Sequence, residues 1–230
     1  MSKIHFIGGE KGGVGKSLVS RLLAQYFIDR EIPFKAYDSD KSHGALLRFY
    51  GDYATPVMVD SYEALDAVVE AALASDVQAL LDLAAQTHLF LARWMDDSNV
   101  LEVSGELGVQ VTYWHVMDSG RDSVDLLRKL LDQFGNRMKL VLALNEVRGD
   151  QFDTLKASGE LERAIAAGAA VISIRKLPDS TMQKIDAYSS SFWAATQQSE
   201  KSSTGLGMLE RQRVRTWLNK SYEQFDQVGV

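Results

Sequence analysis

The sequence predicts an α/β protein built on a mostly parallel, twisted sheet that is flanked by helices. Short apolar runs rich in β-branched residues alternate along the chain with longer segments whose apolar residues recur at helical spacing. This alternation is typical of parallel sheets with right-handed crossovers, in which ligands bind at the carboxyl ends of the strands. A glycine-rich loop also follows the first apolar run directly. No internal repeat interrupts the pattern, and we expect a single domain over residues 1–230.

The individual elements follow from the same periodicities. Strands are expected over residues 3–8, 34–38, 77–82, 109–116, 138–145 and 170–174. Helices are expected over residues 17–30, 61–74, 121–134 and 158–167. Residues 84–105 lack a strong strand signal and are expected to form a helix plus a loop. The polar, glycine-bearing residues 196–207 predict a surface loop before a last amphipathic helix over about residues 208–225.

Composition limits the classes of function. The formal net charge of −6 means that any contact with nucleic acid needs a local basic patch. The chain contains no cysteine, which excludes disulfides, thiolate zinc sites and cysteine-ligated iron–sulfur clusters. The first apolar run is interrupted by glycines too early for a signal peptide. The longest weakly polar stretch, residues 164–174, is shorter than the ~20 residues that a helix needs to cross a bilayer. We therefore expect a soluble, cytoplasmic protein.

The stretch GGEKGGVGKS, residues 8–17, has the features of a phosphate-binding loop. It lies between an apolar strand and an amphipathic helix, which is the context that such a loop requires. Its glycines allow successive amide N–H groups to converge on phosphate oxygens, and the following helix adds the positive end of its dipole. Lys16 is expected to reach the β- and γ-phosphates, and the Ser17 hydroxyl to coordinate Mg²⁺. The general pattern G-x-x-x-x-G-K-[ST] fails at one position, where Glu10 replaces the first glycine.

The stretch KGGVGKS, residues 11–17, resembles the deviant Walker A motif of the ParA/MinD family of ATPases, in which that first position varies. The resemblance implies a P-loop NTPase fold that binds ATP. The implied nucleotide-binding residues of the loop are Gly12, Gly13, Val14, Gly15, Lys16, Ser17 and Leu18.

The second lysine of the loop, Lys11, has a distinct role in that family. The resemblance implies that Lys11 reaches across a dimer interface and touches the phosphates of the nucleotide bound by the partner subunit. A cation there would neutralise charge on the transferring phosphoryl group, much as an arginine finger does. The alternative is that Lys11 is an ordinary solvated loop lysine.

Two carboxylates follow the second predicted strand. Strand alternation places Asp38 and Asp40 on one face at its carboxyl end, beside the phosphate loop. The resemblance implies that Asp40 orients or activates the attacking water, and that Asp38 supports Mg²⁺ through water. The alternative is that Asp40 caps a helix that begins near Lys41.

A third carboxylate, Asp82, ends the third predicted strand and resembles a Walker B aspartate, which binds a water of the Mg²⁺ shell. The family follows this aspartate with proline and glycine, which form a switch that senses the γ-phosphate. Residues 83–86 are instead Leu-Ala-Ala-Gln, so the switch differs from that of the family. Gln86 is a candidate for orienting water, and a capping or surface role is equally open.

Two further residues are candidates for contacts with the nucleotide base. The resemblance implies that Asn145, at the end of the fifth predicted strand, hydrogen-bonds the adenine amino group and favours ATP over GTP. The alternative for Asn145 is an ordinary turn residue. Pro178 would border the base, although a proline before a helix is common. The four histidines show no ligand spacing and are expected to be packed or solvated.

The last predicted helix combines an apolar stripe with scattered cations. The stripe consists of Val214, Trp217, Leu218, Tyr222 and Phe225, and the cations are Arg211, Arg213, Arg215 and Lys220. Three interpretations stay open, namely a basic patch that contacts DNA, an amphipathic membrane anchor, and a helix that packs its stripe on the sheet.

Together, these patterns and the resemblance imply a Mg²⁺- and ATP-dependent ATPase that forms a nucleotide-sandwich homodimer. The resemblance points to plasmid partition, conjugative transfer or intracellular positioning, with slow hydrolysis that a partner protein stimulates. The alternative from another class is a nucleotide-gated adaptor with negligible hydrolysis, which the altered sequence after Asp82 motivates.

Overall fold

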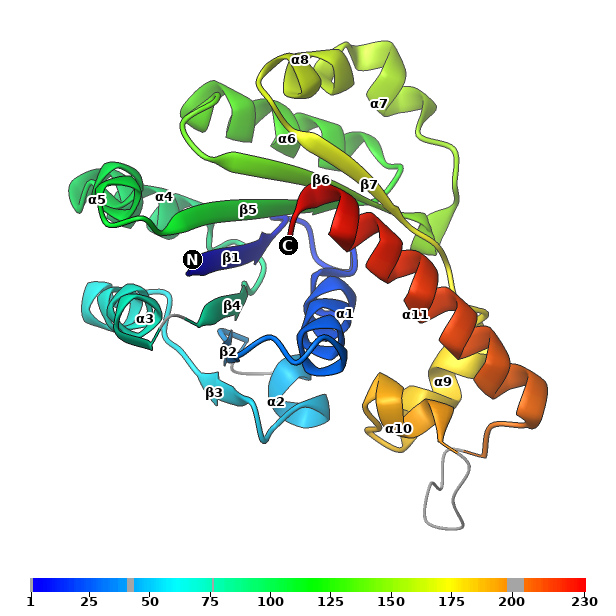
Figure 1. The fold of residues 1–230 in the computed structure, drawn as a ribbon. Coiled ribbons are helices and arrows are strands. Elements are labelled where there is room, and N and C mark those ends of the chain that lie inside the picture. Colours follow the sequence, from blue (N-terminus) through cyan, green and yellow to red (C-terminus); the bar gives the residue numbers. More distant parts are fainter. Residues whose placement is uncertain (1, 41–43, 76, 198–204) are drawn as a thin grey trace.

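The computed structural model describes residues 2–40, 44–75, 77–197 and 205–230. Within these residues, the chain forms an entirely parallel seven-stranded sheet with the order β3-β2-β4-β1-β5-β6-β7 (Figure 1). The α/β fold class and the parallel sheet predicted from the sequence are therefore confirmed.

The strands are β1 Lys3–Gly8, β2 Phe34–Asp38, β3 Ala54–Pro56, β4 Gln78–Asp82, β5 Gln110–Met117, β6 Lys139–Asn145 and β7 Ala170–Ile174. The helices of the first half are α1 Lys16–Asp29, α2 Ala45–Phe49, α3 Tyr62–Ser75, α4 His88–Asp97 and α5 Val100–Glu106. Those of the second half are α6 Arg121–Phe134, α7 Asp153–Ser158, α8 Glu160–Ala166, α9 Asp179–Ala187, α10 Phe192–Thr196 and α11 Met208–Val228, with a 3₁₀ turn at Glu146–Arg148.

Several expected boundaries were wrong. Strand β3 was not predicted, because three residues that include Pro56 carry too little periodicity to be recognised. The helix expected over residues 158–167 is α8, which begins only at Glu160, because Gly159 adopts a φ of 78° and separates it from the unpredicted α7. Residues 84–105 hold two helices and not a helix plus a loop. The last helix continues to Val228, and most of the loop expected over residues 196–207 lies outside the described residues.

Helices cover both faces of the sheet and enclose two apolar clusters. Helices α3 to α8 pack on one face, and α1, α2 and α9 to α11 pack on the other (Figure 1). Strand alternation distributes side chains between the clusters, so that Ile4 and Phe6 of β1 face the first and Ile7 faces the second. A sheet buried on both faces leaves its carboxyl edge as the place for ligands.

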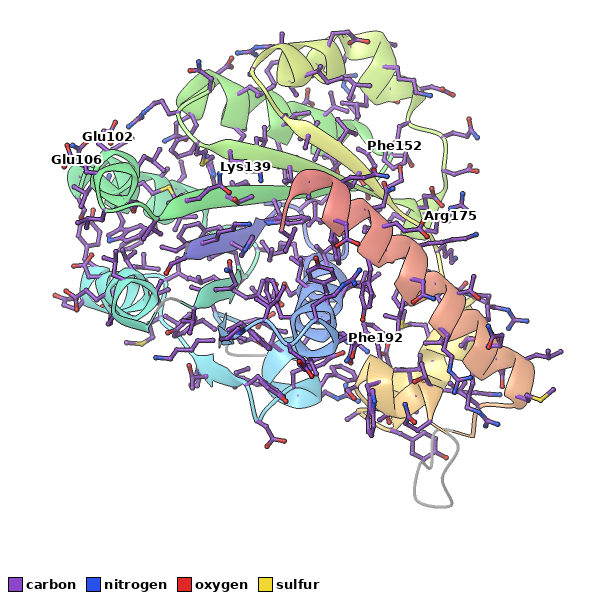
Figure 2. All side chains as sticks on the ribbon, viewed as in Figure 1. Glu102, Glu106, Lys139, Phe152, Arg175 and Phe192 are labelled. Atoms are coloured by element: carbon purple, nitrogen blue, oxygen red, sulfur yellow. The ribbon has the colours of Figure 1, made fainter. Side chains whose placement is uncertain are left out.

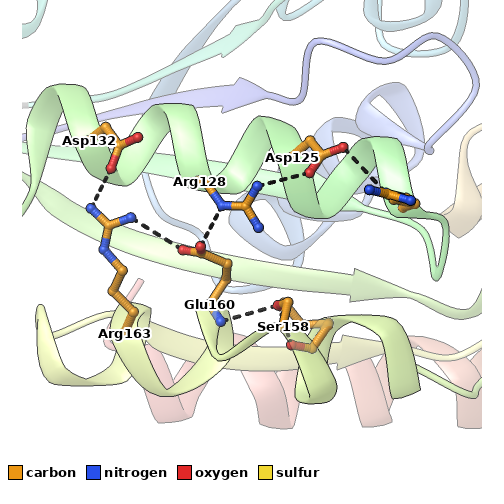
Figure 3. Close-up of polar contacts among 8 residues, drawn as sticks. Asp125, Arg128, Asp132, Ser158, Glu160 and Arg163 are labelled. Carbon is orange, nitrogen blue, oxygen red and sulfur yellow. Dashed lines mark hydrogen bonds and ion pairs between the residues drawn. The ribbon is translucent and has the colours of Figure 1, made fainter.

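An ion-pair network fastens α8 to α6 (Figure 3). The Glu160 carboxylate accepts hydrogen bonds from Arg128 Nε at 2.7 Å and from Arg163 Nη1 at 3.3 Å. Arg163 also donates to Asp132 at 2.6 Å, and Arg128 donates to Asp125 at 3.2 Å. Because the Glu160 side chain is only 9% exposed, we expect its ion pairs to stabilise the fold more than the exposed ones.

The last helix is part of the core. The apolar stripe predicted for α11 is buried against β7, α1 and α10, with Phe225 completely inaccessible and Trp217 5% exposed. The Trp217 indole N–H donates to the carbonyl of Arg175 at 2.6 Å, and Figure 2 shows Arg175 at the end of β7 beside α11. The stripe therefore packs on the sheet, as one of the three interpretations held. Among the described residues, no helix is both long and apolar enough to traverse a bilayer.

Candidate nucleotide-binding site

The phosphate loop joins β1 to α1 and is held from a neighbouring strand. Asn145, at the end of β6, donates from Nδ2 to the carbonyl of Val14 at 2.8 Å and accepts from the Val147 amide. Gly15 adopts a φ of 98°, and a Cβ at this position would lie 2.0 Å from Asn145 Nδ2. Glycine is therefore required at position 15, because a side chain would be strained and would collide with the asparagine.

The Lys16 ammonium lies within the curve of the loop. Its Nζ donates to the carbonyl of Gly9 at 2.8 Å and to that of Lys11 at 3.2 Å. Burial lowers the pKa of Lys16, and the charges of Asp82, Glu10 and Asp40 oppose this shift. A cation held at the centre of the loop can move from these carbonyls to an incoming phosphate oxygen.

A cavity of about 310 Å³ opens at the carboxyl edge of the sheet, beside the loop. Its walls are Gly12, Gly13, Gly15, Lys16, Ser17, Asp40, Asp82 and residues 83–85. The structure thus brings together most of the predicted loop residues and two of the three carboxylates. Val14 is instead buried in the core, and Leu18 packs partly against the same apolar cluster.

Asp82 has the surroundings of a cation ligand. Burial raises the pKa of Asp82 to about 7, and the nearby charge of Asp38 adds to the shift, while the Ser17 hydroxyl opposes it. Among the described residues, Asp82 Oδ1 is buried without a hydrogen-bond partner. A buried carboxylate oxygen of this kind fits a magnesium ion or its water shell, since Mg²⁺ prefers oxygen ligands. No cluster of three or more metal-ligating side chains exists in the described residues, so phosphate and water would complete the shell.

Asp38 is used mainly to hold the backbone. Its Oδ1 accepts from the Asp40 amide at 3.0 Å, and its Oδ2 accepts from the first-turn amides of Leu46 at 2.9 Å and Leu47 at 3.3 Å. The expectation that both aspartates lie on one strand face was wrong, because β2 ends at Asp38 and Asp40 lies beyond it. Asp38 therefore supports the start of α2, and Asp40 lines the cavity. Lys41, the expected start of the helix, is outside the described residues.

Lys11 is paired within its own chain. Its Nζ lies 3.2 Å from Asp118 Oδ2 and 3.6 Å from Asp122 Oδ2. Asp118 is 1% exposed and also accepts from the Ser123 hydroxyl at 2.6 Å and the Gly120 amide at 3.1 Å. Burial alone would raise the pKa of Asp118, but these donors and Lys11 outweigh it and hold the pKa below its usual value. Lys11 is thus a loop cation with a defined intrachain partner.

Two residues beside the phosphate loop, Asp118 and Arg148, were not predicted from the sequence. The Arg148 guanidinium donates from Nη1 to Asp118 at 2.9 Å, and its Nη2 would lie 3.2 Å from a Cβ at Gly13. A positional signal existed for both, since Asp118 lies two residues beyond a predicted strand and Arg148 lies three residues after Asn145. Polar residues just beyond parallel strands gather at the carboxyl edge, beside the loop.

The segment after Asp82 is fixed by hydrogen bonds. The Ser39 hydroxyl donates to the carbonyl of Asp82 at 3.0 Å and accepts from the Ala84 amide at 2.8 Å. On the other side, Glu10 Oε1 accepts from the amide of His88 at 2.7 Å. Gln86 is exposed, adopts a φ of 64° and is not among the residues that line the cavity.

Other predicted residues lie farther from the loop. Pro178 is exposed just before α9, where its carbonyl accepts from the amides of that helix's first turn. On α11, Arg211 and Arg215 donate to backbone carbonyls of residues 206 and 196. Helical periodicity places Arg213 and Lys220 on the opposite flank of the buried stripe. The cations of α11 are therefore divided between two flanks.

Comparisons with known proteins give distant relatives and a similar fold. No protein-family model matches the chain. The chain is 23% identical to protein TraL of Escherichia coli over the full length of both, and 28% identical to protein MobD of Acidithiobacillus ferrooxidans over 58% of this chain and 59% of that protein. The solved structure of chloroplast FtsY from Physcomitrella patens matches with a TM-score of 0.51 and 16% identity. The match covers 77% of this chain and 59% of that one, and it supports the fold alone. The chain thus has the fold of P-loop NTPases, and its sequence resembles the ParA/MinD family of ATPases.

Proposed function

We propose that this protein is a Mg²⁺-dependent ATPase of the ParA/MinD type, whose ATP-bound subunits close into a dimer. The observation that carries the proposal is the cavity in which the phosphate loop faces Asp40 and the Asp82 oxygen that has no hydrogen-bond partner among the described residues. Phosphoryl transfer needs mainly positioning and charge neutralisation, and this cavity supplies groups for both.

The roles of the residues follow from their places in the cavity. The loop amides and Lys16 would hold the phosphates, with Lys16 leaving the carbonyls of Gly9 and Lys11. Ser17 and Asp82 would hold the magnesium ion, which when bound neutralises phosphate charge. Asp40 lines the cavity without belonging to the loop, which suits the orientation of an attacking water.

The intrachain pairing of Lys11 bears on the proposed dimer. In the single chain Lys11 is 23% exposed and lies against Asp118, whose carboxylate also binds Arg148. To reach the phosphates of a partner subunit, Lys11 would have to leave this ion pair. A nearly buried ion pair costs more free energy to break than an exposed one. Closure of the dimer would therefore require new contacts of Lys11 with bound ATP and with the partner subunit.

The test is the molar mass in solution, measured by light scattering without nucleotide, with Mg²⁺-ADP and with a slowly hydrolysed Mg²⁺-ATP analogue. Wild type is compared with Lys11→Ala and with Lys156→Ala, an exposed lysine on α7 that serves as control. We expect a dimer with the ATP analogue alone, lost in Lys11→Ala and kept in Lys156→Ala. An unchanged mass in every state would refute the nucleotide-dependent dimer.

A nucleotide-gated adaptor without significant turnover is a second candidate. The exposed Gln86 and the absence of proline and glycine after Asp82 favour it, because the side chains that sense or activate water differ from those of the family. Phosphate release under saturating Mg²⁺-ATP distinguishes the candidates. Turnover that Asp40→Ala abolishes without weakening nucleotide binding supports the ATPase, whereas binding without turnover, even with DNA or the partner protein present, supports the adaptor.

The assembly surface belongs to the same proposal, with plasmid partition or conjugative transfer as the setting. DNA contact through α11 would use the exposed Arg213 and Lys220, since Arg211 and Arg215 already bind carbonyls. A double Arg213→Ala, Lys220→Ala variant should then lose salt-dependent DNA binding, while the Arg211→Ala, Arg215→Ala pair should lose stability. Membrane contact through the apolar stripe would require α11 to leave the core.

A further inference from the structure

The two places where the sequence departs from the expected pattern are connected through the start of α4. Glu10 occupies the position of the first glycine in the general phosphate loop, and residues 83–86 replace the proline and glycine of the family. Glu10 Oε1 accepts the amide hydrogen of His88, the first residue of α4, at 2.7 Å. A hydrogen bond therefore joins the phosphate loop to the helix that follows the altered segment.

Glu10 supplies what the start of α4 lacks locally. Thr87 occupies the N-cap position but makes no side-chain capping bond, and its hydroxyl donates to the carbonyl of Ala84 at 2.9 Å. The first amides of a helix need an acceptor, and negative charge is favourable near the positive end of the helix dipole. The Glu10 carboxylate meets both needs from a distant part of the chain.

The backbone around Glu10 is anchored by Lys16. The two carbonyls that Lys16 Nζ binds, at 2.8 and 3.2 Å, belong to Gly9 and Lys11, which flank Glu10 on both sides. A phosphate bound in the loop would compete with these carbonyls for the ammonium. Occupancy of the loop would thus release both anchors of Glu10 at once.

A displacement of Glu10 would shift the first turn of α4, because the two are joined by a hydrogen bond. The segment between Asp82 and α4 lines the phosphate cavity, and its Ala84 amide donates to the Ser39 hydroxyl. A change at the phosphate loop or at Ser39 can therefore shift the start of α4. A second cavity of about 130 Å³ adjoins the Glu10–His88 contact and leaves room for a shift. The next residue, Leu89, is 79% exposed and would carry that shift to the surface.

We propose that Glu10 is a positioning residue that couples occupancy of the phosphate loop to the start of α4. It would do so through the His88 amide, in place of the proline–glycine switch that the family has after its Walker B aspartate. The inference rests on the proposed nucleotide binding and adds the route by which bound nucleotide alters the surface near Leu89.

Two substitutions at one position separate this role from the shape of the loop. Glu10→Gln keeps an oxygen acceptor for the His88 amide. Glu10→Gly removes the acceptor and at the same time completes the pattern G-x-x-x-x-G-K-S, so nucleotide binding should persist. The readout is amide hydrogen exchange in peptides covering residues 84–95, with a peptide from α6 as internal control.

Without nucleotide, we expect exchange at the start of α4 to be roughly fivefold faster in Glu10→Gly than in wild type or Glu10→Gln, as loss of a helix cap implies. Adding a Mg²⁺-ATP analogue should change exchange there in wild type and Glu10→Gln but not in Glu10→Gly. Equal nucleotide-dependent changes in all three proteins would overturn the inference. Binding without any change in α4 would refute the coupling alone, whereas wild type that fails to bind nucleotide would refute the proposed function.

Discussion

Asn145 and Gly15 are matched across the carboxyl edge of the sheet. The asparagine amide holds the carbonyl of Val14, and the missing side chain of Gly15 leaves the space in which that amide lies. The two residues are 130 positions apart in the sequence. The Asn145 amide can lie where it does only because position 15 has no side chain. The shape of the phosphate loop is therefore determined partly from β6.

Gly15→Ala should destabilise the protein by about 3 kcal/mol, from left-handed backbone strain and overlap with Asn145. Gly12→Ala is the matched control, because a Cβ at Gly12 would meet no atom of the described part of the chain within 4 Å. We expect its free energy of unfolding to change by less than about 0.5 kcal/mol. Urea unfolding of both variants provides the measurement, and equal losses would contradict the role given to Asn145.

Asn145→Ala should weaken binding of ATP and GTP alike, by about tenfold, because it leaves the Val14 carbonyl without its donor and loosens the loop. Titration with fluorescent analogues of both nucleotides measures the effect. The sequence also predicted an adenine contact for this residue. Loss of affinity for ATP alone would favour that contact over the loop-holding role.

Binding of Mg²⁺ and nucleotide should release a proton from Asp82 in mildly acidic solution. With a pKa of about 7, the Asp82 carboxyl is mostly protonated near pH 6, and a magnesium ion favours the ionised form. Calorimetry in buffers of different ionisation enthalpy should detect close to one proton near pH 6 and almost none near pH 8.5. The Asp82→Asn variant should show no such release, and its persistence there would assign the proton to another group.

Glu160→Gln should lower the free energy of unfolding by about 2 kcal/mol, since it weakens charged hydrogen bonds at a nearly buried carboxylate. Asp125→Asn is the comparison, because its ion pairs with Arg128 and Arg121 are exposed and should contribute less than about 0.5 kcal/mol. Urea unfolding at low and high salt tests both. An equal cost for the two variants would mean that burial does not decide the strength of this network.

Local patterns in the sequence predicted those parts of the fold that are formed by residues close together in the sequence. The six predicted strands are present with ends shifted by at most one residue, because a buried parallel strand is a short apolar run with clear limits. The phosphate loop was recognisable for a similar reason, since its function depends on consecutive amides and a fixed spacing of Lys16 and Ser17.

Contacts between distant residues were beyond the reach of the same patterns. The pairing of Lys11 with Asp118 spans 107 residues, and that of Glu10 with His88 spans 78. Both depend on the strand order, which places β1 between β4 and β5. Local periodicity does not encode that order, so the partners of these loop residues appear only in three dimensions.

The outer strands of the sheet leave little backbone available to a neighbouring molecule. Strand β3 is three residues long and ends in Pro56, which has no amide hydrogen to share. At the opposite edge, the amide of Ser173 in β7 donates to Gln224 of α11 at 3.1 Å. Such edges resist aggregation by strand addition. A second copy of the chain is thereby hindered from extending the sheet at either end.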